Sequence, residues 1–107
     1  MDSNYIPPDE VKYPIMIDKT PIDYDALIVD FHGIECQGKT AQECEANAAA
    51  AINSKLAELI DNDLPMVFPS IGTNEALYIS PDRLIRSEIS RMTIPKGPLG
   101  KKGNILG

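Results

Sequence analysis

The segment from Asp30 to Ile52 constrains the fold of this 107-residue chain more than any other stretch of its sequence. It contains a Thr-Ala-Gln-Glu run in which the Thr40 side chain can accept the backbone N–H of Glu43, and the Glu43 carboxylate can reach back to the N–H of Thr40. This capping box predicts a helix that begins near Ala41 and continues to about Asp61. Apolar residues recur along that span at helical spacing and form one stripe, which should lie on a sheet: Cys44, Ala48, Ala51, Ile52, Leu56, Leu59 and Ile60.

Short β-favouring segments precede the helix. Strands are predicted at residues 12–18, 24–31 and 34–37, with a hairpin loop at 19–23. Pro14 should restrict the first strand to a sheet edge, or else mark a strand start. Gly33 and Gly38 read as turn residues, placed where a positive φ or a close backbone approach would exclude a side chain. The second strand alternates, with Ala26, Ile28 and Asp30 expected on one face and Leu27, Val29 and Phe31 on the other.

Two further elements are predicted after the long helix. Residues 75–80 favour a fourth strand, and residues 81–92 a short helix that Ser80 caps, with Pro81 at its first position. A chain of this length with 43% hydrophobic residues can bury one core. The expected fold class is therefore α/β, a three-to-four-stranded sheet packed by one long helix, plus a short C-terminal helix. The domain should span 12–92, between a flexible N-terminal arm at 1–11 and a flexible basic tail at 93–107.

Charge is distributed unevenly along the chain. The net charge is −6, but residues 1–80 carry fourteen acidic residues against four lysines, whereas residues 81–107 carry six basic residues against two acidic ones. An acidic body repels nucleic acid and attracts a basic partner, although acidic surfaces also simply favour solubility. No apolar run approaches a membrane span or a signal peptide, which favours a cytoplasmic protein without a membrane partner.

The residues around the predicted helix start carry a family resemblance. The pattern D-x-x-G-x-x-x-x-G-x-T-x-x-E-x-x-x-N-A-x-x-A resembles the signature segment of the HicB antitoxins, and is filled here by Asp30, Gly33, Gly38, Thr40, Glu43, Asn47, Ala48 and Ala51. The likeness extends from about Lys12 to Ser70. It departs from the family in the turn, where His32, Gly33 and Ile34 replace the usual Pro-Gly-Cys, and at Lys39, which replaces an acidic residue.

The resemblance implies a fold, a function and a partner. HicB domains have a degenerate RNase H-like fold and bind the HicA ribonuclease toxin, so we expect a non-enzymatic antitoxin that occludes a small basic toxin. The alternative is a stand-alone HicB-like inhibitor, encoded by a phage or mobile element, that binds a host defence or nucleic-acid enzyme. A third hypothesis is a residual RNase H-like nuclease using Asp30 and Glu43. Exposed sheet edges also favour a homo-oligomer.

The candidate partner-binding residues lie in the turn and at the helix start: Asp30, His32, Glu35 and Lys39. We do not assign His32 a catalytic role, because no nucleophile or second polar partner is spaced to act with it. His32, Cys36 and Cys44 lack the paired spacing of a zinc site, and Cys44 fits a small core residue. Asp30 and Glu43 are explained by the family turn and the capping box. No nucleotide-binding or serine-hydrolase motif occurs, so no enzyme activity, metal or cofactor is expected.

A weaker candidate for nucleic-acid binding is the basic stretch formed by Arg83, Arg86, Arg91, Lys96, Lys101 and Lys102. Many HicB antitoxins add a DNA-binding domain at this end. Residues 75–89 could supply a ribbon and a first helix of such a domain, but the sequence has no second helix. A solvated basic tail is therefore favoured over operator binding.

Overall fold

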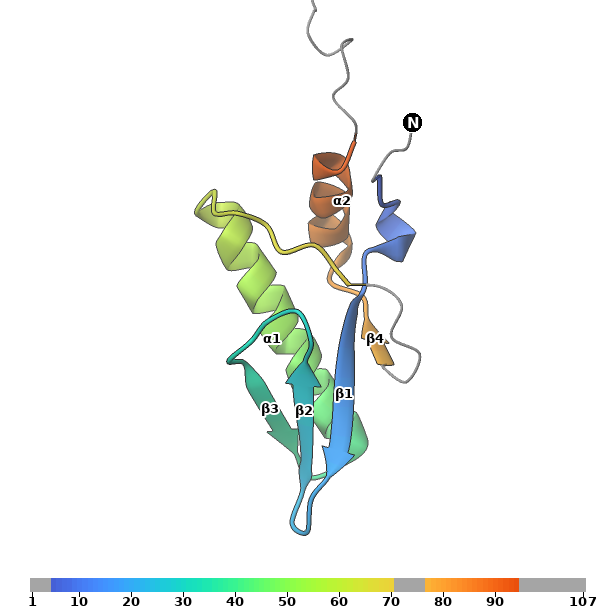
Figure 1. Ribbon diagram of the computed structural model, residues 1–107, viewed down its shortest axis with the longest axis vertical. Helices are drawn as coiled ribbons and strands as arrows, with labels where there is room; N and C mark the ends of the chain where they lie inside the picture. The colour runs from blue at the N-terminus through green and yellow to red at the C-terminus, as the bar shows by residue number, and fades with distance from the viewer. Residues whose placement is uncertain (1–4, 71–76, 95–107) are drawn as a thin grey trace, which may run out of the picture.

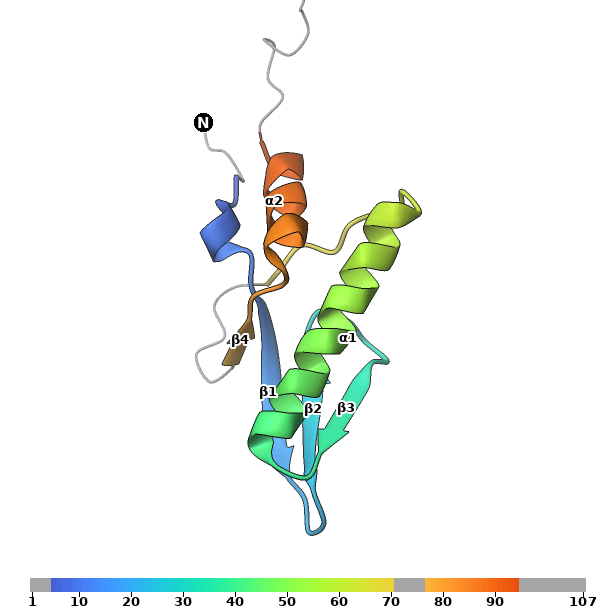
Figure 2. The same cartoon turned by 180° about the vertical axis from the view of Figure 1, so that it is seen from behind.

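The computed structural model describes residues 5–70 and 77–94 of the chain. In this part, a four-stranded antiparallel sheet is covered on one face by a long helix, and a shorter helix lies beyond one end of the sheet (Figures 1 and 2). The expected α/β class is confirmed, whereas the RNase H-like relation stays a prediction. The elements are η1 (Pro8–Glu10), β1 (Tyr13–Lys19), β2 (Tyr24–Ile28), β3 (Glu35–Gly38), α1 (Ala41–Asp61), β4 (Leu77–Ile79) and α2 (Arg83–Met92).

The strands lie in the order β3-β2-β1-β4, so β1 is an interior strand. Pro14 is its second residue, which confirms the strand-start alternative and excludes the edge. An interior proline is tolerated here because the β1–β2 pairing ends at Ile15 and Ile28, so the nitrogen of Pro14, which has no hydrogen to donate, lies beyond the paired residues. Its carbonyl still accepts the N–H of Val29 at 3.2 Å. The hairpin between β1 and β2 was predicted correctly, and the Thr20 hydroxyl closes it by accepting the N–H of Asp23 at 2.9 Å.

The core lies between the sheet and α1. The predicted stripe of α1 faces the sheet, and Cys44, Ala48, Ile52, Leu56 and Leu59 are buried, while Ala51 and Ile60 are half-buried at its margins. The sheet contributes the alternate residues of its strands: Tyr13, Ile15, Ala26, Ile28, Cys36 and Ile79. The helix bounds are those predicted, because an apolar stripe of the right period and a strong start signal agree.

The start of α1 confirms the capping box with one change. The N–H of Glu43 donates to Oγ1 of Thr40 at 3.0 Å, as predicted, but the Glu43 carboxylate accepts the N–H of Lys39 at 2.7 Å rather than that of Thr40. Gly38 makes the predicted close approach, since a Cβ there would lie 2.4 Å from the backbone nitrogen of Cys44. Gly33 has the predicted positive φ, at 88°.

The bounds of all four strands differ from the prediction, and β1 begins and ends one residue later than expected, at Tyr13–Lys19. β2 ends at Ile28 instead of Phe31, because the chain turns and buries Phe31 against Tyr13, with ring centroids 5.6 Å apart. The expectation that Phe31 shares a face with Leu27 is therefore wrong. β3 is shifted by one residue, to Glu35–Gly38. β4 is described from Leu77, and residues 75–76 of the predicted strand lie outside the described part.

The short helix α2 begins at Arg83 with Asp82 as its N-cap, so the predicted cap by Ser80 is wrong. A tertiary contact sets this start: the N–H of Asp82 donates to the side-chain oxygen of Asn53 in α1 at 2.7 Å, and Pro81 is buried. Local capping signals near Ser80 and Pro81 could not reveal a partner 29 residues away.

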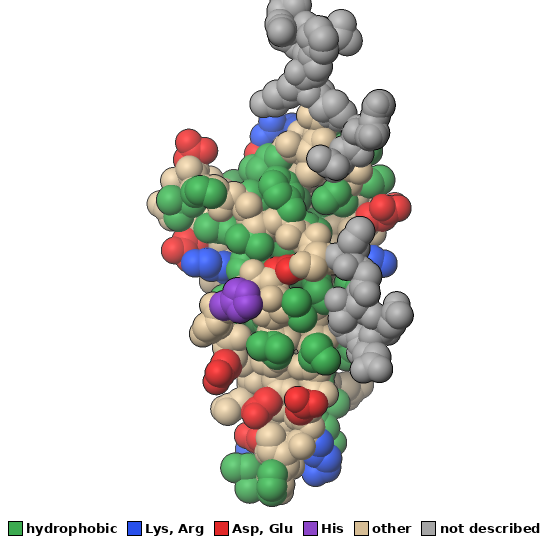
Figure 3. Space-filling view, in the orientation of Figure 1, with side chains coloured by type: hydrophobic (Ala, Val, Ile, Leu, Met, Phe, Trp, Pro, Cys, Tyr) green, Lys and Arg blue, Asp and Glu red, His purple; other side chains and the backbone are tan. Residues whose placement is uncertain are grey.

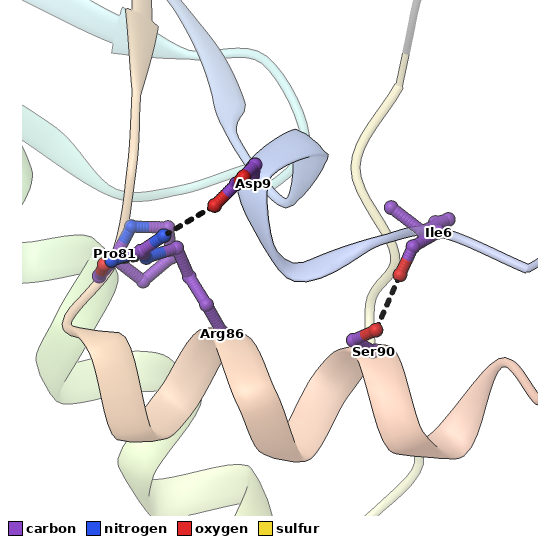
Figure 4. Close-up of polar contacts among 5 residues, drawn as sticks. All are labelled: Ile6, Asp9, Pro81, Arg86 and Ser90. Carbon is purple, nitrogen blue, oxygen red and sulfur yellow. Dashed lines mark hydrogen bonds and ion pairs between the residues drawn. The ribbon is translucent and has the colours of Figure 1, made fainter.

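The N-terminal segment packs on α2 (Figure 4). Oγ of Ser90 donates to the carbonyl of Ile6 at 2.6 Å, the N–H of Ile6 donates to Oγ1 of Thr93 at 2.8 Å, and Val11 is fully buried. Residues 5–11 of the predicted flexible arm therefore have fixed contacts. Residues 1–4, and residues 95–107 of the predicted flexible basic tail, lie outside the described part.

Candidate partner-binding face

The face of the sheet opposite α1 is the candidate site, and no described helix covers it (Figures 1 and 3). Strand alternation and register place its side chains in two cross-strand rows. We call this set the outer face, and it consists of the row Met16, Leu27 and Glu35 and the row Asp18, Asp25 and Gln37.

The first row exposes apolar surface in the middle of the sheet. Leu27 is 53% exposed and Met16 is 39% exposed, and they lie directly opposite each other. In Figure 3, apolar side chains lie in the middle of this face of the molecule, with acidic side chains below them and to one side. An apolar centre with a polar rim is the composition of many protein-binding surfaces.

The second row places two like charges opposite each other. Asp18 pairs with Asp25 across β1 and β2, which opposes sheet formation unless another group compensates. Oδ1 of Asp25 is buried and has no hydrogen-bond partner in the described part of the chain. A shallow pocket of about 160 Å³ opens here, lined by Asp18, Asp25, Ala26, Leu27, Glu35 and Gln37.

The described residues give these acids no internal counter-ion. The ion pairs found there join Lys55 to Glu58, Arg86 to Asp9, and Arg91 to Glu88. The nearby lysines of β1 and its approach lie over tyrosine rings instead, at 5.5 Å from the ring centroids: Lys19 over Tyr24, and Lys12 over Tyr78. The outer face thus presents negative charge available to a cation from another molecule.

The four predicted partner-binding residues do not lie together on one surface. Glu35 lies on the outer face, and His32, the purple side chain in Figure 3, is exposed beside it in the turn before β3. Lys39 is exposed beyond the opposite end of β3, where its N–H is held by Glu43. Asp30 has a structural role: Oδ2 accepts the N–H of Ser70 at 2.8 Å, and Oδ1 accepts the Ser70 hydroxyl.

Met16, Asp18, Asp25 and Leu27 were missed as site residues. The signal that could have found them is the alternation of β1 and β2, which sends every second residue away from the helix. Two acidic and two apolar residues on the outward positions of one hairpin mark a surface that differs from an ordinary solvated face.

Four of the residues considered for catalysis or metal binding have structural roles: Asp30, Glu43, Cys36 and Cys44. Asp30 and Glu43 both accept backbone N–H groups, and in the described part no group of three or more His, Cys, Asp or Glu side chains is placed to hold a metal ion. Cys36 and Cys44 are buried free thiols, and burial raises the pKa of both. Cys44 is the small core residue that the sequence indicated.

Two of the three described arginines of the basic stretch are engaged within the protein. Nε of Arg86 donates to the carbonyl of Pro81 at 2.9 Å, and its guanidinium lies 3.8 Å from Asp9 (Figure 4). Arg91 pairs with Glu88 one turn away. Arg83 is exposed, and the predicted contacts of Lys96, Lys101 and Lys102 lie outside the described residues.

Comparisons with known proteins do not identify a family. No protein-family model matches the chain, and no curated protein is significantly similar to it. No helix in the described ranges combines the length and hydropathy required to cross a membrane. The HicB resemblance therefore stays a prediction, and the arguments for function come from the geometry of the outer face.

Proposed function

We propose that this protein is a non-enzymatic, HicB-like antitoxin whose outer face binds a small basic ribonuclease toxin and covers its RNA-contacting surface. The observation that supports the proposal is the outer face itself: acidic side chains that have no counter-ion among residues 5–70 and 77–94 border exposed apolar residues, on a sheet face that no described helix covers. A ribonuclease must present positive charge to RNA, so its RNA-contacting surface is complementary to such a face.

Each part of the outer face has a distinct task in this proposal. Met16 and Leu27 supply the apolar centre from which binding excludes water. Asp18 and Glu35 attract the partner and set its orientation. The buried oxygen of Asp25 gains a charge-assisted hydrogen bond when an arginine or lysine of the partner enters the pocket beside it.

The test is affinity capture of the tagged protein from its native host, with the bound proteins identified by mass spectrometry. The test variant is Asp18→Lys with Glu35→Lys, which reverses two charges on the outer face. Glu10→Lys with Glu45→Lys is the matched control, because both residues are exposed and lie away from that face, and the change in net charge is the same. Asp30 is kept unchanged because it holds Ser70.

We expect the wild type and the control to recover a small basic ribonuclease, and the test variant to lose it. Recovery of a larger defence or nucleic-acid enzyme, lost in the same variant, would replace the antitoxin assignment with the stand-alone inhibitor. A partner that the test variant binds as well as the wild type does would contradict the assignment of the outer face.

A further inference from the structure

A second candidate surface lies on the α1 side of the sheet, between the C-terminal half of α1 and α2, and Figure 2 shows where the two helices lie. It is a groove of about 230 Å³, with a mostly apolar lining and acidic groups beside it. We call it the helix groove, and it is lined by Ala57, Ile60, Asp61, Leu84, Ile85 and Glu88.

Leu84 is the most exposed of the apolar side chains that line the helix groove. It is 83% exposed, whereas the buried side of α2 is formed by Ile89 and Ser90. A single exposed leucine needs no explanation, but Leu84 projects beside a groove that could receive a side chain of its own kind. The surface therefore contains both an apolar projection and an apolar recess.

The charges around the groove are also complementary to one another. Arg83 precedes Leu84 on α2, and Asp61 lines the groove at the end of α1; both are exposed. Neither forms an ion pair within the described residues. This surface thus carries a projection, a recess, and a cation and an anion that have no ion-pair partner in the described part of the chain. Such a surface meets the condition for a two-fold contact, in which one patch serves on both subunits.

We propose that the helix groove binds a second copy of this chain about a two-fold axis. Leu84 of each copy inserts into the groove of the other, between Ile60 and Ile85, and Arg83 of each copy pairs with Asp61 of its partner. The contact lies on the helix side of the sheet, so both outer faces stay accessible in the dimer. This inference goes beyond the function proposed above and does not depend on it.

The test is sedimentation velocity of the full chain over a concentration series from about 1 to 300 μM. Leu84→Asp is the disrupting variant, and Ile22→Asp is its matched control, because Ile22 is 86% exposed in the β1–β2 hairpin, far from α2 in the fold. We expect a concentration-dependent dimer for the wild type and for the control, and at least tenfold weaker association for Leu84→Asp. Circular dichroism during heating checks that both variants stay folded.

A charge exchange tests the pairing itself. Arg83→Asp and Asp61→Arg should each weaken the dimer, and the double variant should recover association to within about threefold of the wild type. A monomer at every wild-type concentration, a dimer that Leu84→Asp leaves unchanged, or a double variant no better than the single ones would each overturn the proposed contact.

Discussion

Replacing Asp25 by asparagine should stabilise the free protein. Asp25 and Asp18 are directly opposite each other on the outer face, and no cation within the described residues lies between them. Two carboxylates about 6 Å apart repel by about 0.7 kcal/mol in a water-like dielectric, within the range measured for cross-strand pairs. Asparagine has nearly the same shape as aspartate but carries no charge, so the substitution removes this electrostatic repulsion. For a domain of this size, the gain corresponds to a melting temperature about 4 °C higher.

The assay is urea denaturation of the wild type, of Asp25→Asn and of a control, Glu10→Gln, at low and high salt. Glu10 is exposed and lies away from the sheet, so we expect its variant to match the wild type. At 1 M NaCl the Debye length is about 3 Å, and the advantage of Asp25→Asn should fall to about 0.1 kcal/mol. An unchanged or lowered stability at low salt, or a gain that salt does not reduce, would refute the electrostatic reasoning.

Three further changes test the fold around the site. Burial, with a smaller contribution from Asp30, raises the pKa of Tyr13 above its ordinary value of 10.0, so its contribution to stability is complete below about pH 10 and is lost as the pH rises toward the folded-state pKa. Between pH 9 and 11 the wild type should therefore lose more unfolding free energy than Tyr13→Phe, as measured by urea denaturation, and equal losses would count against this. Thr40→Ala removes the N-cap of α1 and should cost about 1 kcal/mol in the same assay, whereas Thr40→Ser should cost little. Gly38→Ala forces a Cβ against the backbone of Cys44 and should cost about 1 to 3 kcal/mol, and a neutral result would show that the chain relaxes there without penalty.

The long helix could be predicted from the sequence because its signals are local. Thr40, Glu43 and the apolar stripe lie within 21 residues of one another, and each indicates the same element. The β1–β2 hairpin could also be predicted from the sequence, since Thr20 and Asp23 close it through their own side chains. Propensity, capping and periodicity were sufficient wherever the partners are near in sequence.

The candidate site was harder to predict because it depends on pairing between strands. That Asp18 opposes Asp25 follows only once the hairpin register is known, and a shift of one residue would move both to the other face. Asp30 was assigned to partner binding because its hydrogen bond to Ser70, 40 residues away, leaves no trace in the local sequence. The start of α2 was misplaced for the same reason, since Asn53 fixes it from another helix.

The most direct test of the central claim is the ribonuclease activity of the captured partner, measured on a fluorogenic RNA while the purified chain is titrated in. We expect the wild type and the Glu10→Lys, Glu45→Lys control to abolish RNA cleavage at about one equivalent. The Asp18→Lys, Glu35→Lys variant should need at least about a tenfold higher concentration to give the same inhibition. A partner that cleaves no RNA, or one that the outer-face variant inhibits as well as the wild type does, would contradict an antitoxin acting through this face.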